Sequence, residues 1–399
     1  MGCPLAAGSE RKMSKLETMP GAPKRPSRKP KGGKTKDGTS EGQSPTGRES
    51  KKSITIGGIE VMPGERRTID LPVTDLSTHT PITMPIQVIC GRRTGPTLFV
   101  CAALHGDEIN GVEVIRRLLR LTALKRLQGT LIAVPIVNVL GFVSQSRYLP
   151  DRRDLNRSFP GSAQGSLAGR LARIFLDEIV ANSTHGIDLH TAAIHRDNFP
   201  QVRANLDDPE TARLAQAFGV PFIINTGFRE GSLREAAAGL SVPVVVYEAG
   251  EALRFDENCI RAGVKGVVRA MRLLEMLPPT SRRSRGIKSL VIRSSKWVRA
   301  PHSGLLRAAA ALGSAVSEGQ LLGVISDPFG ENEAEVRASA SGVIIGRSNI
   351  PLVHEGDALF HIARHEGTQI VARSLDDFEP EAAYERGLTS ELAGEAPIV

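Results

Sequence analysis

The chain has 399 residues, long enough for two or three domains with a large hydrophobic core. Apolar residues make up 40% and charged residues 24%, as in an ordinary soluble globular protein, and the aromatic fraction of 4% leaves few side chains for stacking on nucleic-acid bases. Residues 1–52 contain thirteen Lys or Arg and five Asp or Glu, which accounts for the whole net charge of +8. We therefore expect a disordered basic tail with no specific nucleic-acid partner.

The cysteines and the hydropathy pattern indicate in which cellular compartment the protein is expected. Cys3, Cys90, Cys101 and Cys259 are scattered and form no CxxC pair, so a thiolate zinc site is not indicated. The sequence shows no signal-peptide pattern and no apolar run of membrane-spanning length. These features predict a cytoplasmic protein without a membrane partner.

Regular structure is expected from about Ile54 onward. The segments SITIGGIEV, RRTIDLPV and MPIQVIC resemble short strands, and from Pro96 apolar runs alternate with amphipathic segments. The expected strands are Thr97–Ala103, Thr130–Val137, Gly186–His190, Pro221–Ile224 and Val242–Glu248, and the expected helices are Ile109–Leu121, Ser166–Ala181, Pro209–Phe218, Ser232–Ala238 and Glu257–Leu277. This alternation predicts an α/β domain over residues 53–280 with a mostly parallel sheet.

The pattern of apolar residues changes after the segment PPTSRRSRG, residues 278–286. This segment has the composition of a linker. Residues 281–365 contain short apolar stretches punctuated by Gly and acidic turns, which predicts a small all-β domain. Residues 366–399 have the composition of an acidic C-terminal tail.

Residues of types that commonly bind metals lie at or just after the ends of two expected strands. His105 and Glu108 lie in the turn of CAALHGDEING, and His190 ends the strand of GIDLHTAA. The carboxyl ends of parallel strands gather at one edge of a sheet, so the three side chains can meet there. Two imidazoles and a carboxylate with one open position are a usual ligand set for catalytic zinc. The alternative for His190 is a core histidine satisfied by hydrogen bonds.

Two aspartates accompany these residues. Asp107 lies in the same turn, and we expect it to cap the following helix. Asp188 is two residues before His190 on the same strand face, where it can orient a ligand histidine or serve as a structural carboxylate.

Two further segments carry ionisable residues with a chemical use. The loop SRYLPDRRDLNRSFPG contains Asn156 among four arginines, whose guanidinium groups suit a carboxylate substrate or ordinary surface ion pairs. Glu248 ends the apolar strand of VPVVVYEAGE, where burial of a carboxylate is costly without a partner. Glu248 is therefore a candidate general base, with a helix cap or an ion-pair partner as the alternative.

The motifs HGDEING, DLNRSFPG, DLHTAA and YEAGE, in this order, resemble the succinylglutamate desuccinylase/aspartoacylase family of the zinc carboxypeptidase superfamily. The resemblance covers roughly residues 54–365. It implies one zinc ion per chain bound by His105, Glu108 and His190, Glu248 as the catalytic glutamate, Asn156 and Arg157 as the substrate-carboxylate site, and Arg147 as the oxyanion arginine. Arg152 competes with Arg147 for that role, because PDRR lengthens the stretch before DLNR.

The resemblance also implies a fold and a reaction. The fold is a mixed sheet flanked by helices, followed by a barrel-sandwich-like β domain. The hairpin FGENEAEVRA of that domain has no lysine for a covalent cofactor, so we expect the domain to shape the site entrance or a homo-oligomer contact. The implied reaction is hydrolysis of the amide bond of a small N-acyl amino acid, with water activated by zinc and Glu248. Arg229 and Arg234 either contact the substrate or are surface charges.

Two alternatives remain open at this point. A metallocarboxypeptidase that trims C-terminal, possibly acidic, residues from a peptide or protein would use the same groups. A non-catalytic scaffold would bind an acidic partner through its basic arm, and deletion of residues 1–52 would abolish that binding while an enzyme would keep its turnover.

Overall fold

The computed structural model of the protein describes residues 53–279 and 289–364. The expected basic tail, most of the expected linker and the expected acidic tail lie outside the described residues. Among the described residues, no helix is both long enough and apolar enough to cross a membrane.

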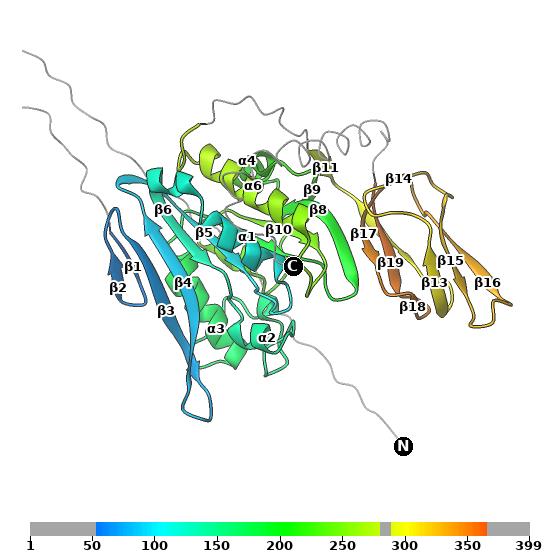
Figure 1. Ribbon diagram of the computed structural model, residues 1–399, viewed down its shortest axis with the longest axis horizontal. Helices are drawn as coiled ribbons and strands as arrows, with labels where there is room; N and C mark the ends of the chain where they lie inside the picture. The colour runs from blue at the N-terminus through cyan, green and yellow to red at the C-terminus, as the bar shows by residue number, and fades with distance from the viewer. Residues whose placement is uncertain (1–52, 280–288, 365–399) are drawn as a thin grey trace, which may run out of the picture. The chain divides into compact units, whose positions relative to one another are not determined.

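The first part of the described chain builds a large sheet and the helices that cover it (Figure 1). Its strands are β1 (Ile54–Ile56), β2 (Ile59–Val61), β3 (Arg66–Asp75), β4 (Pro81–Cys90), β5 (Arg93–Ala102), β6 (Gln128–Val134), β7 (His185–His190), β8 (Arg196–Ala204), β9 (Phe222–Asn225) and β10 (Val244–Gly250). Its α-helices are α1 (Asn110–Leu118), α2 (Val139–Val143), α3 (Leu167–Phe175), α4 (Pro209–Phe218), α5 (Leu233–Gly239) and α6 (Glu257–Leu273). Short helical turns occupy Thr122–Arg126, Leu155–Arg157 and Leu176–Val180.

The sheet is mixed, as the family resemblance implies. Its central strands are parallel, as the strand–helix alternation predicts. Strands β6, β5, β7 and β10 are parallel neighbours, but β8 runs antiparallel beside β10, and β4 and β3 continue antiparallel beyond β6. The expected strands and helices are confirmed with shifted ends. Strand β8 was not predicted, because RDNFPQVRA contains a proline and several polar residues.

Side-chain alternation along the strands divides the interior into two layers. Val100, Leu189 and Tyr247 face a core shared with α1, α4 and α6. Phe99 and Cys101 face the opposite core, which is shared with α3 and α5. Because successive side chains point to opposite faces, the residues between the members of the first core face the α3 and α5 side. His190 and Glu248 lie on that side.

The second part of the described chain is all-β, as predicted. Its strands are β11 (Leu290–Ile292), β12 (Ser295–Arg299), β13 (Gly304–Ala308), β14 (Ala315–Val316), β15 (Leu321–Ser326), β16 (Glu333–Arg337), β17 (Gly342–Ser348), β18 (Leu352–Val353) and β19 (Ala358–Arg364). Strands β16, β15, β13 and β18 form one antiparallel sheet. Strands β17, β19 and β12 extend the large sheet, because β17 pairs with β8. The pairings among the described strands close no barrel. The expected domain boundary near residue 280 stays a prediction.

Candidate active site

The structure brings His105, Glu108 and His190 together, as the sequence predicts. His105 Nδ1 lies 2.7 Å from Glu108 Oε1, and His190 Nδ1 lies 2.7 Å from Glu108 Oε2. Each residue offers one ligand atom, and these three atoms lie within 4.8 Å of one another. All three residues are buried. This cluster has the composition and spacing of a three-ligand metal site.

The turn that presents His105 and Glu108 depends on close backbone packing. A Cβ atom at Gly106 would lie 2.0 Å from the carbonyl carbon of Gly141, so only glycine fits between the turn and α2. Ala103 has a positive φ of 49°, which turns the chain out of β5 just before the histidine. The amide of Glu108 donates to the carbonyl of His105 at 3.1 Å and closes the turn.

Two aspartates bind the outer nitrogens of the two imidazoles. His190 Nε2 lies 2.8 Å from Asp188 Oδ2, and His105 Nε2 lies 3.1 Å from Asp154 Oδ1. Such carboxylate contacts fix the ring orientation and the tautomer of metal-binding histidines. In both rings Nδ1 is the atom that faces Glu108. The donor set of two imidazoles and a carboxylate, with both imidazoles oriented by carboxylates, therefore fits zinc.

Charges inside the cluster reverse the effect that burial alone would have on the pKa values of its members. Burial alone would raise the pKa of Glu108 and lower those of the two histidines. The two imidazoles instead bring the pKa of Glu108 well below its usual range. The neighbouring carboxylates raise the pKa values of His105 and His190, against the effect of burial. The carboxylate is thus ionised, which is the form that binds a metal ion.

Arg147 belongs to this cluster, whereas Arg152 does not. Arg147 Nη1 donates to Glu108 Oε1 at 3.1 Å, and Arg147 Nη2 donates to Asp154 Oδ2 at 3.2 Å. Arg152 is exposed, and among the described residues its side chain forms no ion pair. Arg147 therefore contacts a candidate metal ligand, and its oxyanion role stays a prediction.

Glu248 lies beside His190 in the sheet. The two residues are register partners in the parallel pair of β10 and β7, so their side chains share the α3 and α5 face. Glu248 Oε2 accepts a hydrogen bond of 3.1 Å from Asn198 Nδ2 and lies 2.9 Å from Arg203 Nε. The carboxylate is therefore paired within the sheet and is close to the candidate ligands.

The loop of Asn156 and Arg157 is tied to the segment before α5. Asn156 Oδ1 accepts a hydrogen bond of 2.9 Å from the amide of Leu233, which leaves its Nδ2 group to donate elsewhere. Arg157 Nη1 donates to the carbonyl of Asn156, and among the described residues Arg157 pairs with no carboxylate. Burial and the nearby guanidinium of Arg229 lower the pKa of Arg157. The Asp154 carboxylate opposes this shift but forms no ion pair with Arg157 within the described part of the chain, and such a guanidinium suits an anionic ligand.

Arg234 takes part in local structure near the site. It donates to the carbonyl of Gly227 at 3.0 Å and to Thr226 Oγ1 at 3.2 Å, and its guanidinium lies 5.9 Å from the ring centroid of Phe228. Burial and the positive charge of Arg203 lower the pKa of Arg234. The Glu248 carboxylate opposes this shift, and the substrate role of Arg234 stays a prediction.

The expected helix-capping role of Asp107 is wrong. Helix α1 begins after Ile109, and no side chain caps it. Asp107 is buried, and its Oδ1 atom has no hydrogen-bond partner among the described residues. Burial and the charge of Glu108 raise its pKa. The turn packs inward against the chain near Leu253, whose amide donates to the Asp107 carbonyl at 2.8 Å, so the side chain lies inside the protein.

The sequence did not point to Asp154, Asn198 or Arg203. Asp154 is the first residue of the DLNR motif and contacts His105. Its position two residues before Asn156 was the sequence signal that could have pointed to it. Asn198 and Arg203 lie on the unpredicted strand β8, and their contact with Glu248 depends on the pairing of β8 with β10.

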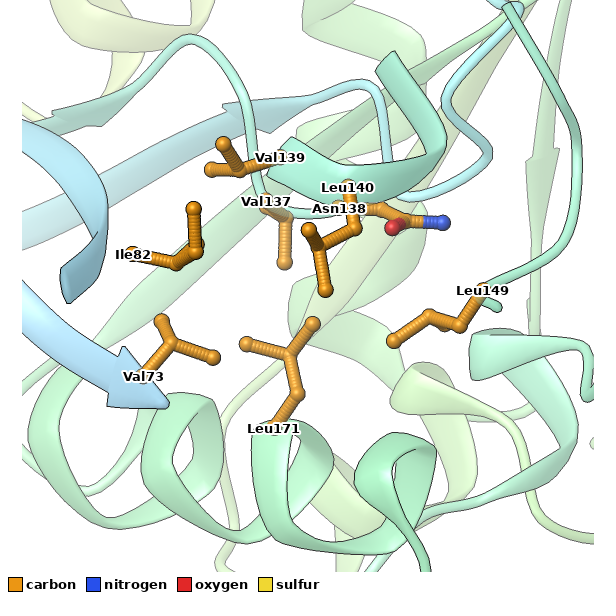
Figure 2. Close-up of a pocket in the computed structure, with 8 residues that line it drawn as sticks. All are labelled: Val73, Ile82, Val137, Asn138, Val139, Leu140, Leu149 and Leu171. Carbon is orange, nitrogen blue, oxygen red and sulfur yellow. The ribbon is translucent and has the colours of Figure 1, made fainter. Parts of the chain in front are cut away.

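Figure 2 shows a mostly apolar pocket. It is lined by Val73, Ile82, Val137, Asn138, Val139, Leu140, Leu149 and Leu171. None of the candidate catalytic or metal-binding residues lines it.

Replacing Asp188 with asparagine is expected to lower zinc affinity about 10- to 100-fold. The amide keeps the size of the side chain but loses the negative charge that orients and polarises the His190 ring at 2.8 Å. Competition with a chelating dye would measure the affinity. Asp177→Asn is the matched control, since that aspartate pairs with Arg173 on an exposed helix surface. Equal affinities of both variants would contradict the orienting role of Asp188.

Comparisons with known proteins show what the chain resembles. Residues 94–274 match the model of the succinylglutamate desuccinylase/aspartoacylase catalytic domain. The chain is 29% identical over 323 residues to the N-alpha-acetyl-L-2,4-diaminobutyric acid deacetylase of Halomonas elongata, an alignment that covers 74% of this chain and 90% of that protein.

Solved structures show the same fold. The succinylglutamate desuccinylase/aspartoacylase of Rhodobacter sphaeroides is 26% identical, with a TM-score of 0.67 over 75% of this chain and 95% of that chain. The product-bound ectoine utilization protein EutE (DoeB) of Ruegeria pomeroyi is 23% identical and shares the fold, with a TM-score of 0.69 over 75% of this chain and 95% of that chain. The fold, the matched domain and the sequence relative lead to one conclusion: residues 94–274 are similar to the catalytic domain of the succinylglutamate desuccinylase/aspartoacylase family, and the chain shares the fold of solved members.

Proposed function

We propose that the chain hydrolyses the amide bond of a small N-acyl amino acid in a zinc-dependent reaction. The observation that carries the proposal is the buried cluster of His105, Glu108 and His190 on the same side of the sheet as Glu248. These three residues would bind one zinc ion per chain. Zinc, when bound, polarises the scissile carbonyl and makes hydroxide available near neutral pH.

The residues of this chain then have distinct roles. Glu248 takes a proton from the attacking water and later gives it to the leaving nitrogen as the carbon–nitrogen bond breaks, which yields a carboxylate and a free amine. Arg147 stabilises the negative charge that develops on the carbonyl oxygen. Asn156 and Arg157 bind the carboxylate of the amino acid, and this role is supported by the free Nδ2 group of Asn156 and by the absence of a carboxylate partner for Arg157 among the described residues.

The sequence relative narrows the substrate class. The Halomonas elongata protein is a deacetylase of N-alpha-acetyl-L-2,4-diaminobutyric acid. By analogy we propose a small acyl group on an amino acid with a free carboxylate as the substrate of this chain. The main alternative is a metallocarboxypeptidase, which would use the same residues on a peptide.

A substrate panel tests the proposal directly. Purified, zinc-loaded protein would be assayed for release of a primary amine from acetyl and succinyl derivatives of Asp, Glu and diamino acids, and from short peptides ending in Glu. Turnover of an N-acyl amino acid would support the proposal. Turnover of the peptides alone would favour the carboxypeptidase, and no turnover at all would reject the deacylase function.

Arg157→Met is expected to raise KM for the preferred N-acyl amino acid by about 10- to 100-fold, with a smaller effect on kcat. The guanidinium would pair with the substrate carboxylate throughout the reaction, so its loss weakens ground-state and transition-state binding alike. Steady-state kinetics would separate the two constants. Arg170→Met, which removes an arginine on the nearby helix α3, is the control. An unchanged KM in Arg157→Met would exclude Arg157 from carboxylate binding.

A further inference from the structure

Strand β8 presents two polar side chains to Glu248. In the pairing of β8 with β10, Gln201 lies opposite Glu248 and Arg203 lies opposite Val246, so Arg203 shares the face of the carboxylate. Arg203 Nε is 2.9 Å from Glu248 Oε2 in an ion pair without hydrogen-bond alignment, and Asn198 Nδ2 donates a hydrogen bond of 3.1 Å to the same oxygen. Among the described residues no donor contacts Oε1. The two β8 side chains therefore fix one oxygen of Glu248 and leave the other available.

The position of Asn198 is limited from its other side by strand β17. Gly346 of β17 is the register partner of Asn198, which is buried. A Cβ atom at Gly346 would lie 2.8 Å from Asn198 Oδ1. The φ angle of Gly346 is outside the left-handed region, so alanine suits its backbone and only space is lacking. The side chain of Asn198 is thus confined between β17 and the Glu248 carboxylate.

We propose that Asn198 and Arg203 are positioning residues for Glu248, and that β17 sets the position of Asn198 through Gly346. The proposal rests on the proposed function. Both positioning residues contact Oε2, so Oε1 is the atom that accepts and returns the proton. The C-terminal β strands thereby support the general base, although none of their side chains belongs to the proposed metal or substrate sites.

The arrangement has a kinetic consequence. Proton transfer requires the carboxylate oxygen within hydrogen-bond reach of the proton, so a small displacement of Glu248 slows the chemical step. Zinc binding and carboxylate binding use other residues and are unaffected. A defect in positioning therefore lowers kcat and leaves KM and zinc content nearly unchanged.

The first test is a double-mutant cycle between Gly346 and Asn198. Gly346→Ala and Asn198→Ala are each expected to lower kcat about tenfold, because each disturbs a hydrogen bond to a charged group. The double variant is expected to be no slower than Asn198→Ala, since the added methyl group then has no asparagine to displace. Gly239→Ala is the matched control, because a Cβ atom there has no neighbour within 4 Å. Additive losses would overturn the action of β17 through Asn198.

The second test concerns Arg203 and remains informative if Gly346→Ala does not fold. Arg203→Met is expected to lower kcat about tenfold with KM and zinc content within about twofold of the wild-type values. Arg203→Lys is expected to recover part of this loss, because lysine retains a cation that can pair with Oε2. An unchanged kcat in Arg203→Met, or a change confined to KM, would overturn its positioning role.

A structural measurement separates this proposal from the proposed function. Crystal structures of the zinc-loaded wild-type chain and of Asn198→Ala would show whether the Glu248 carboxylate moves or loses its order. Movement supports positioning, and an unmoved carboxylate overturns it, whether or not the substrate panel yields turnover. Failure of the wild-type chain to hydrolyse any N-acyl amino acid would instead reject the proposed function alone.

Discussion

Glu248→Gln is expected to lower kcat by about 10²- to 10⁴-fold, while KM and zinc content stay close to those of the wild-type chain. The amide has nearly the same shape, and its oxygen can still accept the hydrogen bond that Asn198 now donates at 3.1 Å. It cannot take a proton from water at neutral pH. The variant should therefore bind substrate and metal normally and fail at the chemical step. Steady-state kinetics and metal analysis would measure the three quantities.

Glu251→Gln is the matched control for that variant. Glu251 lies three residues further along, and its carboxylate accepts hydrogen bonds from the amide of His195 at 3.0 Å and from Asn349 Nδ2 at 2.9 Å. It contacts neither Glu248 nor the candidate ligands through any hydrogen bond within the described part of the chain. Glu251→Gln should keep nearly full activity. Equal losses in both variants would show that general disturbance of this segment, rather than loss of the base, explains the effect.

The candidate ligands were predictable from sequence because local patterns and sheet geometry combine at these positions. Apolar runs identify β5 and β7 as strands, and parallel strands bring their carboxyl ends to one edge. His105 follows the first strand and His190 ends the second, so their convergence needs no knowledge of distant contacts. Glu248 is a register partner of His190 for the same reason.

The environment of Glu248 was not predictable in this way. Strand β8 begins with three polar residues and carries Pro200, so no apolar run marks it. Its antiparallel pairing with β10 and with β17 joins segments that are far apart in the chain. The roles of Asn198 and Arg203 follow from those pairings, which periodicity does not encode.

Asp107 shows a second limit of local reasoning. An aspartate just before a helix predicts an N-cap, and the local sequence offers nothing against it. The turn instead packs against α2 at Gly106, and Asp107 becomes buried. Tertiary packing therefore overrides a capping preference that is worth only about 1 kcal/mol. The packing that makes the N-cap prediction for Asp107 wrong also holds His105 and Glu108 in place.

His190→Ala is expected to abolish both zinc binding and turnover, a larger effect than loss of the base, because one of three protein ligands is removed. The matched control is His185→Ala, on the same strand. His185 points to the opposite face from His190, and its Nε2 atom lies 3.3 Å from Glu210 Oε1. That variant should keep about one zinc per chain. Metal analysis after dialysis, with kinetics on the same samples, measures both quantities.

Chelation of the wild-type chain should abolish turnover without unfolding the protein. Without the metal, Glu108 still binds both imidazoles at 2.7 Å, so no charge is left buried without a partner. Thermal unfolding should therefore remain cooperative, at a lower midpoint because a ligand of the folded state is lost. Zinc added back should restore activity in the wild-type chain and not in His190→Ala. Zinc binding by His190→Ala at the wild-type level would place the metal elsewhere, since two remaining ligands cannot hold it as three do.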